Sequence, residues 1–201
     1  MAFVINDDYL PATLTAQPMT DEEFAEFCAN HPDLSFEMTS QGEIIVEAPS
    51  DSLTGASRFE VVGELRNWAR KDGRGIGCDS STGFVLPDGA RRSPDASWTL
   101  KSRVKAIDGH RRKGFWHLCP DFVIEIKSDS DRLRTLRKKM GEYLANGAQL
   151  GWLIDPEHRS VEIYRPGNEA ELRTGIDRLA GEGPVDGFVL DLTYVWDPLA
   201  E

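Results

Sequence analysis

Residues 120–156 contain a predicted strand, a long helix and a second strand, and this order constrains the fold more than any other part of the chain. The first strand, "PDFVIEIKSD", is a mostly apolar run behind a proline. The following "SDSDRLRTLRKKMGEYLANG" carries apolar residues at helical spacing, and Gly147 is expected to close that helix. The second strand, "LGWLIDP", forms a predicted hairpin with "SVEIYRP". A strand–helix–strand connection of this kind indicates an α/β protein with a mixed sheet.

The chain before this segment predicts a short helix, a hairpin and another long helix. Residues 1–18 are expected to form a loose N-terminal arm, and residues 19–201 a single domain. Thr20 and Glu23 have the spacing of a capping box, which begins the short helix. The hairpin is "LSFEMTSQGEIIVEAP", which contains two alternating runs around a turn. The long helix is "GASRFEVVGELRNWARKDG", and Gly73 is expected at its left-handed end.

The composition excludes several classes of protein. Hydrophobic residues make up 40% of the chain, which is enough to build a core. No apolar run approaches the roughly 20 residues of a membrane helix, and the N-terminus lacks the features of a signal peptide. The three cysteines, Cys28, Cys78 and Cys119, fit neither a zinc pattern nor a disulfide framework. A reduced, cytoplasmic protein is therefore expected.

Charge is distributed unevenly along the sequence. The net charge of −11 opposes a protein that coats nucleic acid non-specifically. Residues 91–139, which include a long basic loop at roughly 101–117, nevertheless hold 14 Lys and Arg against 6 Asp and Glu. These basic residues form either an ordinary solvated surface or a surface that contacts phosphates. In the second case, the phosphate contacts are expected from Arg111, Arg112, Lys113, Arg137 and Lys138.

The strand at 120–129 carries an acid and a base within an apolar run. Residues two apart in a strand share a face, so Glu125 and Lys127 are expected to point the same way. Taking an ion pair out of water costs several kcal/mol per ion, and mutual attraction does not always recover this. The strand is therefore expected either to border a wet cleft or to hold these groups for chemistry. A buried structural ion pair is the alternative.

Asp95 is a second carboxylate in an unusual place. It directly follows Pro94, and proline suits the first position of a strand, so Asp95 is expected near a strand end facing a cleft. Asp95 and Glu125 together can hold a hard divalent cation such as Mg²⁺ or Mn²⁺. Such a cation polarises a phosphate and helps make hydroxide from water. Lys127 can then orient the water or neutralise developing charge, which is the chemistry of phosphodiester cleavage.

These residues carry a family resemblance. "SPD", followed about 30 residues later by "EIK", is similar to the PD-(D/E)XK nuclease motif, with Asp95, Glu125 and Lys127 at its positions. The wider pattern, including "GFVLPDGARRSPDASW" and the whole of 120–156, resembles the putative restriction endonuclease family of the restriction-endonuclease-like superfamily. The resemblance covers roughly residues 20–195. It implies an αβββαβ core with a mixed sheet flanked by helices and extra β-hairpins, a divalent metal site and nuclease activity.

The resemblance also suggests further site residues and partners. Similar nucleases often add an acid from the first core helix, where Glu60 is preferred over Glu64, and a polar residue from the second, here Lys139. Ordinary solvated side chains are the alternative for all three. Nucleic acid, with DNA preferred over RNA, is the expected partner. A homodimer is plausible because double-strand cutting needs two active sites. The competing interpretation is a catalytically silent relative that binds nucleic acid or protein.

Overall fold

A computed structural model describes residues 12–15, 19–47, 50–109 and 114–200. Its centre is a six-stranded sheet in the order β11-β10-β9-β8-β7-β4, in which only the β8–β9 pair is parallel. The chain builds this sheet in the predicted αβββαβ order. The elements of that core are α2 (Ser52–Asp72), β4 (Gly75–Asp79), β7 (Ala96–Leu100), β8 (Phe122–Ile126), α4 (Leu133–Ala145) and β9 (Leu150–Asp155).

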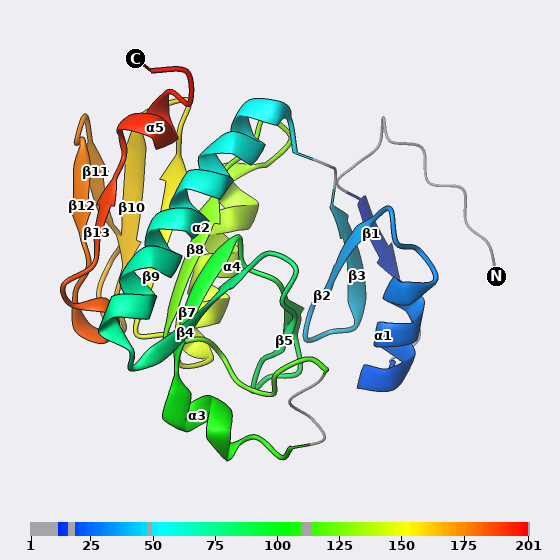
Figure 1. The fold of residues 1–201 in the computed structure, drawn as a ribbon. Coiled ribbons are helices and arrows are strands. Elements are labelled where there is room, and N and C mark those ends of the chain that lie inside the picture. Colours follow the sequence, from blue (N-terminus) through cyan, green and yellow to red (C-terminus); the bar gives the residue numbers. More distant parts are fainter. Residues whose placement is uncertain (1–11, 16–18, 48–49, 110–113, 201) are drawn as a thin grey trace.

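Helices cover both faces of the core sheet (Figure 1). On one face, α2 packs with α5 (Thr193–Trp196) and the β12–β13 pair (Arg178–Ala180 and Val189–Asp191), while α4 covers the other. The side chains of β8 divide between two hydrophobic clusters, one on each face of the sheet. Ile124 and Ile126 belong to the hydrophobic cluster under α2, whereas Val123 belongs to the cluster under α4. Because successive residues alternate between faces, Glu125 lies on the α4 side.

Local signals in the sequence define the ends of the helices. Thr20 and Glu23 form the predicted capping box at the start of α1 (Asp21–Ala29). Gly73 ends α2 with a φ of 71°, a left-handed conformation that glycine adopts without steric strain. At the other end of α2, the side chain of Asp51 accepts hydrogen bonds from two backbone N–H groups and satisfies donors that the helix leaves free.

A smaller sheet, in the order β1-β3-β2-β6-β5, stands beside the core with α1 (Figure 1). Its centre is the predicted hairpin, β2 (Ser35–Met38) and β3 (Glu43–Glu47). The chain from the core contributes β5 (Phe84–Val85) and β6 (Arg91–Arg92). Part of the expected loose arm is ordered instead, because β1 (Ala12–Thr15) pairs with β3 and fills that sheet edge.

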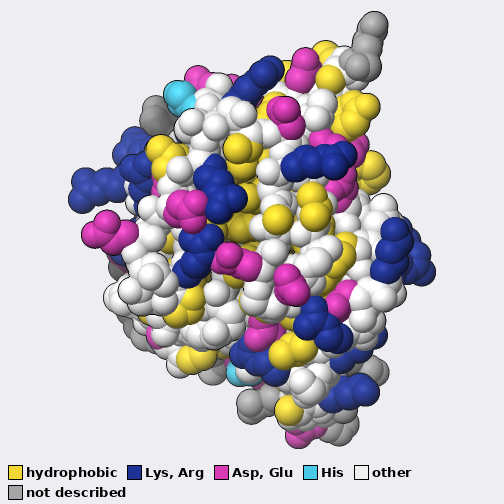
Figure 2. Space-filling model, turned by 90° about the vertical axis from the view of Figure 1, so that its left-hand side faces the viewer, with side chains coloured by type: hydrophobic (Ala, Val, Ile, Leu, Met, Phe, Trp, Pro, Cys, Tyr) yellow, Lys and Arg dark blue, Asp and Glu magenta, His cyan; other side chains and the backbone are white. Residues whose placement is uncertain are grey.

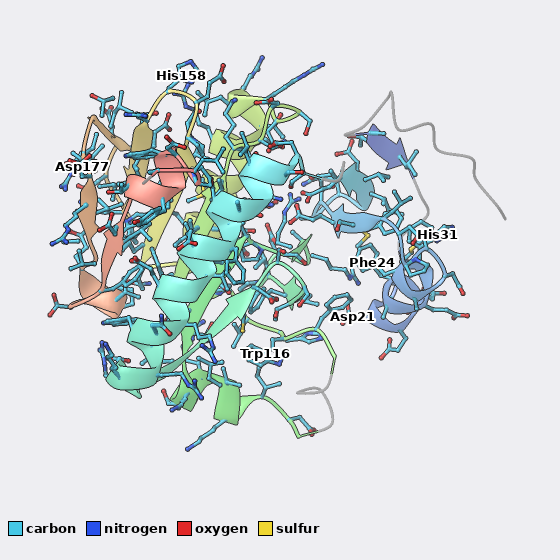
Figure 3. The ribbon with its side chains drawn as sticks, turned by 45° about the horizontal axis from the view of Figure 1, so that its top comes forward. Asp21, Phe24, His31, Trp116, His158 and Asp177 are labelled. Carbon is cyan, nitrogen blue, oxygen red and sulfur yellow. The ribbon has the colours of Figure 1, made fainter. Side chains whose placement is uncertain are left out.

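Contacts around α1 join the smaller sheet to the core. Asp21 forms an ion pair with Arg91, at 2.5 Å, and its Oδ2 lies 2.9 Å from His117 Nε2. Figure 3 shows Asp21 and Phe24 near the segment that carries Trp116. The expected basic loop at 101–117 also differs from the structure, because its first part is the helix α3 (Lys101–Ala106). This helix buries Val104, an apolar side chain that a solvated loop would leave exposed.

The C-terminal part of the chain extends the core sheet and adds extra hairpins. β10 (Ser160–Tyr164) pairs with β9 and β11 (Glu171–Thr174), and a short helical turn, η3 (Gly183–Val185), separates β12 from β13. On this side, apolar side chains lie scattered among charged ones (Figure 2). Within the residues that the structure describes, no helix has the length and apolar character needed to cross a membrane.

Candidate functional site

Asp95 lies where the end of β8 meets the start of β7. Its Oδ2 accepts a hydrogen bond of 2.7 Å from the backbone N–H of Ile126, and its Oδ1 lies 3.0 Å from Arg58 Nε. The carboxyl group is buried. Pro94 ends the preceding segment, so Asp95 enters the sheet as β7 begins. The hydrogen bond to Ile126 holds this carboxylate at the same end of the sheet as Glu125.

Glu125 projects from β8 toward α4 and is only 3% exposed. Its Oε1 accepts hydrogen bonds from the Tyr143 hydroxyl at 2.9 Å and lies 2.9 Å from Lys139 Nζ. Both partners come from α4, one turn apart on a single face. Among the described residues, none donates a hydrogen bond to Oε2 of Glu125. Both described contacts of this buried carboxylate are with the same oxygen, Oε1.

Lys139 joins the core to the smaller sheet. Its ammonium lies 2.9 Å from Glu37 Oε1 on β2 and 3.8 Å from Glu47 Oε1 at the end of β3. Glu37 in turn pairs with Arg92 at 3.0 Å and accepts a hydrogen bond of 2.8 Å from the backbone N–H of Ser93. Glu37 thus holds both the ammonium and the segment that leads directly into Asp95.

Burial shapes the protonation of the two carboxyl groups. It raises the pKa of Glu125 to about 8, against the attraction of the Lys139 ammonium, and the nearby negative charges of Asp95 and Glu37 add to the rise. Burial likewise raises the pKa of Asp95, although the guanidinium of Arg58 works in the opposite direction. In both acids, burial disfavours the charged form because the surroundings have low polarity. An added positive charge would stabilise the charged form of each carboxylate.

The cations of the cluster keep their charge. Burial alone would lower the pKa of Lys139, but the carboxylates of Glu125, Glu37 and Glu47 raise it well above its ordinary value. Burial also opposes the charge of Glu37, yet Lys139 and then Arg92 outweigh it and lower the pKa of that carboxyl group. The Lys139 ammonium thus lowers the pKa of both Glu37 and Glu125, and in Glu125 burial outweighs it.

Lys127 follows the end of β8 and extends the ladder, because its backbone N–H donates to Ile154 O at 2.8 Å. Its ammonium lies 3.3 Å from Glu157 Oε2, in the turn between β9 and β10, so its described ion-pair partner is Glu157 and not Glu125. Glu157 is 63% exposed, and ion pairs at such positions contribute little to stability. The same turn carries Asp155 and His158, which could hold a metal ion together with Glu157.

The first core helix brings a base, not an acid, to Asp95. Arg58 makes that contact. Glu64 instead accepts a hydrogen bond of 3.0 Å from the backbone N–H of Asp191 in β13. Glu60 lies half-buried on α2, and no described contact links it to Asp95 or Glu125. A catalytic role for Glu60 stays a prediction.

The expected phosphate-binding residues are only partly described. Arg111, Arg112 and Lys113 lie outside the described residues. Arg137 pairs with Glu162 through its Nε, at 2.9 Å, and its Nη2. Lys138 is exposed on the next position of α4. Within this group, Arg137 would therefore have to leave a carboxylate before it could contact a phosphate.

Sequence reasoning missed the contribution of the smaller sheet. Glu37 alternates with buried Phe36 and Met38, which predicts a solvent-facing side chain, yet Glu37 is 2% exposed because a second layer covers that face. No spacing rule links a hairpin at residues 35–47 to a strand at 122–126. Arg91 and Arg92, directly before the Asp95 segment, are buried and need acidic partners, but their burial is visible only in the structure.

The residues present fit a divalent metal ion of the kind that the resemblance implies. Asp95 and Glu125 are oxygen ligands of the type that Mg²⁺ and Mn²⁺ prefer. Within the described part of the chain, the cluster also has more acids than bases. Its acids are Glu37, Glu47, Asp95 and Glu125, and its bases are Arg58, Arg92 and Lys139.

Comparisons with known proteins agree with this geometry. Residues 21–193 match the Uma2 family, described as "putative restriction endonuclease". The fold is similar to the crystal structure of a putative nuclease belonging to DUF820 from Anabaena variabilis, with a TM-score of 0.73. The two sequences are 23% identical, and the match covers 91% of this chain and 100% of the other. None of the curated proteins compared with the chain matches it. The likeness establishes a restriction-endonuclease-like fold.

Proposed function

This chain belongs to the Uma2 family of putative restriction endonucleases, and we propose that it hydrolyses phosphodiester bonds in DNA with a divalent metal ion, Mg²⁺ or Mn²⁺. The observation that carries the proposal is the meeting of Asp95 and Glu125. Asp95 directly precedes β7 and Glu125 lies in the adjacent strand β8; both carboxyl groups are buried, and the charge of Asp95 raises the pKa of Glu125. A fold does not need two desolvated acids side by side, because their burial costs several kcal/mol.

Each residue of the site has a separate role in the proposed reaction. Asp95 and Glu125 would hold the ion, Glu125 through its Oε2, which has no described hydrogen-bond donor. A bound divalent ion supplies a Lewis acid for the phosphate and lowers the pKa of water. Lys127, at the edge of the site, would steady the attacking water or the charge that develops on the phosphate. Tyr143 and Lys139 would fix the orientation of Glu125.

Incubation of the protein with plasmid DNA, single-stranded DNA and RNA tests the proposal. The substrates are offered with Mg²⁺, with Mn²⁺ and with a chelator. We expect cleavage of DNA with either ion and none with the chelator. If no substrate is cleaved under any of these conditions, the proposed activity is wrong. Cutting of both strands at one place would further predict a homodimer, which the molecular mass in solution would reveal.

A specific observation favours a second candidate, a relative that binds nucleic acid or protein without cutting it. Each acid of the site already has a basic partner in the structure: Asp95 has Arg58, and Glu125 has Lys139. Such a cluster could be purely structural. Calorimetric titration with Mn²⁺ distinguishes the two candidates, because a nuclease site should bind the ion through Asp95 and Glu125. For a silent relative, the heat of Mn²⁺ binding should be absent, or should be the same in the parent and in Glu125→Gln.

A further inference from the structure

A basic groove lies at the opposite end of the core from the Asp95–Glu125 site. It has a volume of about 410 Å³ and runs between the second half of α2 and β4, with α3 beside it. In Figure 1, α2 runs along the core to its C-terminal end near α3. Gly75 pairs with Leu100, at the end of β7 far from Asp95. The cationic residues that line the groove are Arg66 and Arg70 from α2 and Lys101 from α3.

The cations of this groove have no acidic partner. Arg66, Arg70 and Lys101 are exposed, and no described carboxylate lies within ion-pair distance of any of them. Many other arginines of this acidic chain are paired, for example Arg137 with Glu162 and Arg173 with Glu171. The described residues that line the groove include no acid. An anion therefore meets positive charge there without having to displace a carboxylate.

One side of the groove is the edge strand β4. β4 is an edge strand of the core sheet, so the backbone groups on its free side are not used by a neighbouring strand. Two of the lining residues are glycines: Gly77 is exposed, whereas Gly75 is buried beside the Trp98 indole. Arg66 and Arg70 are one helical turn apart, so their side chains project side by side over the groove. This combination suits an extended anionic chain.

We infer that this groove binds the phosphate backbone of the nucleic acid on which the proposed nuclease acts; the inference rests on that function. Arg58, at the site, and Arg70, at the groove, are 12 positions apart on α2, which corresponds to ~18 Å along the helix. One strand of a duplex advances 3.4 Å per nucleotide, so the groove contacts phosphates about five nucleotides from the scissile bond. Substrate recognition thus extends along α2 from Arg58 to Arg70.

The test is DNA binding by the double variant Arg66→Gln/Arg70→Gln. Binding to a duplex of about 30 base pairs, which spans both places, is followed by fluorescence anisotropy with Ca²⁺ in place of Mg²⁺. We expect Kd to rise roughly tenfold or more, and the slope of log Kd against log salt to fall by about two, one for each lost phosphate contact. The matched control, Arg173→Gln/Arg178→Gln, removes the same charge from β11, at the opposite edge of the core sheet from β4, and from β12, and its Kd should stay close to that of the parent.

Three outcomes would overturn this inference, and a fourth would separate it from the proposed function. Equal DNA affinity of Arg66→Gln/Arg70→Gln and the parent would overturn the inference. An equal loss of DNA affinity in the control variant would overturn it as well. A parent that binds no DNA would also overturn it. If the parent binds DNA through Arg66 and Arg70 but cleaves no substrate, the groove stands and the nuclease proposal fails.

Discussion

Lys139 Nζ lies 2.9 Å from Glu125 Oε1, so the acid of the predicted "EIK" motif pairs with a lysine of the following helix. The lysine within the motif, Lys127, pairs with Glu157 instead. The face-sharing expected for Glu125 and Lys127 therefore does not produce an ion pair between them. Glu125 is tied to α4, and among the described residues the ammonium of Lys127 pairs with the exposed carboxylate of Glu157. The two lysines have different surroundings, and different consequences are expected from removing each.

Replacement of Lys139 by methionine should destabilise the fold. The change leaves Glu37 and Glu125 buried without their shared ammonium, and removal of one partner of a buried ion pair costs about 3 to 5 kcal/mol. Urea unfolding of Lys139→Met against the parent measures the loss. Lys138→Met, an exposed neighbour, is the control and should change the free energy of unfolding by less than about 0.5 kcal/mol. Equal stability of the two variants would contradict the role assigned to Lys139.

The stability of the metal-free protein should fall as pH rises. The pKa of Glu125 is about 8 in the folded chain and has an ordinary value of 4.5, so between these values the folded state binds more protons than the unfolded state. The contribution of Glu125 is fully present below about pH 4.5 and is lost as pH rises through about 8. Glu125→Gln cannot ionise, so we expect a flatter dependence. Chemical unfolding in a chelator at several pH values checks this; identical pH profiles for parent and variant would be evidence against it.

Lys127→Ala should affect the cleavage rate much more than metal binding. The ammonium group has no lone pair with which to bind a metal, and its proposed contacts strengthen as charge develops in the transition state. We expect a rate about two orders of magnitude lower, with Mn²⁺ affinity within a small factor of the parent. Single-turnover cleavage and calorimetry on the same preparation separate the two effects. A variant that cuts as fast as the parent would remove Lys127 from the mechanism.

Gly75→Ala should destabilise the core. An added Cβ at this position would lie 2.1 Å from the Trp98 indole, which is fully buried and cannot move aside. Overpacking of this kind typically costs about 1 to 3 kcal/mol. Gly77→Ala is the control on the same strand, because its Cβ would meet nothing closer than 3.8 Å. Thermal unfolding compares the two variants, and a Gly75→Ala protein as stable as Gly77→Ala would show that the indole has room to shift.

Most of the core could be predicted because its signals are local. The capping box at Thr20, the left-handed Gly73 and the strand–helix–strand order of residues 120–156 each depend on neighbouring positions. The expected αβββαβ order and mixed sheet are confirmed by the structure. Local signals of this kind survive folding because tertiary packing reinforces them.

The parts that could not be predicted depend on contacts between distant segments. Glu37 looks solvent-facing within its own hairpin, and only the approach of α4 buries it against Lys139. Arg58 could not be linked to Asp95, because α2 and β7 meet through the fold and not through a spacing. β1 was missed for the same reason, since four residues become a strand only beside β3. Pairing of this sort has no signature in a single sequence.

The most direct test of the proposed site is the single-turnover rate of DNA cleavage with Mn²⁺, for the parent and for Asp95→Asn and Glu125→Gln. These changes keep the size of each side chain and remove only the charge that would hold the ion. We expect the parent to cleave DNA, the chelator to stop it, and each variant to be slower by roughly two orders of magnitude or more. Cleavage by both variants at the rate of the parent would contradict a metal-dependent active site at Asp95 and Glu125.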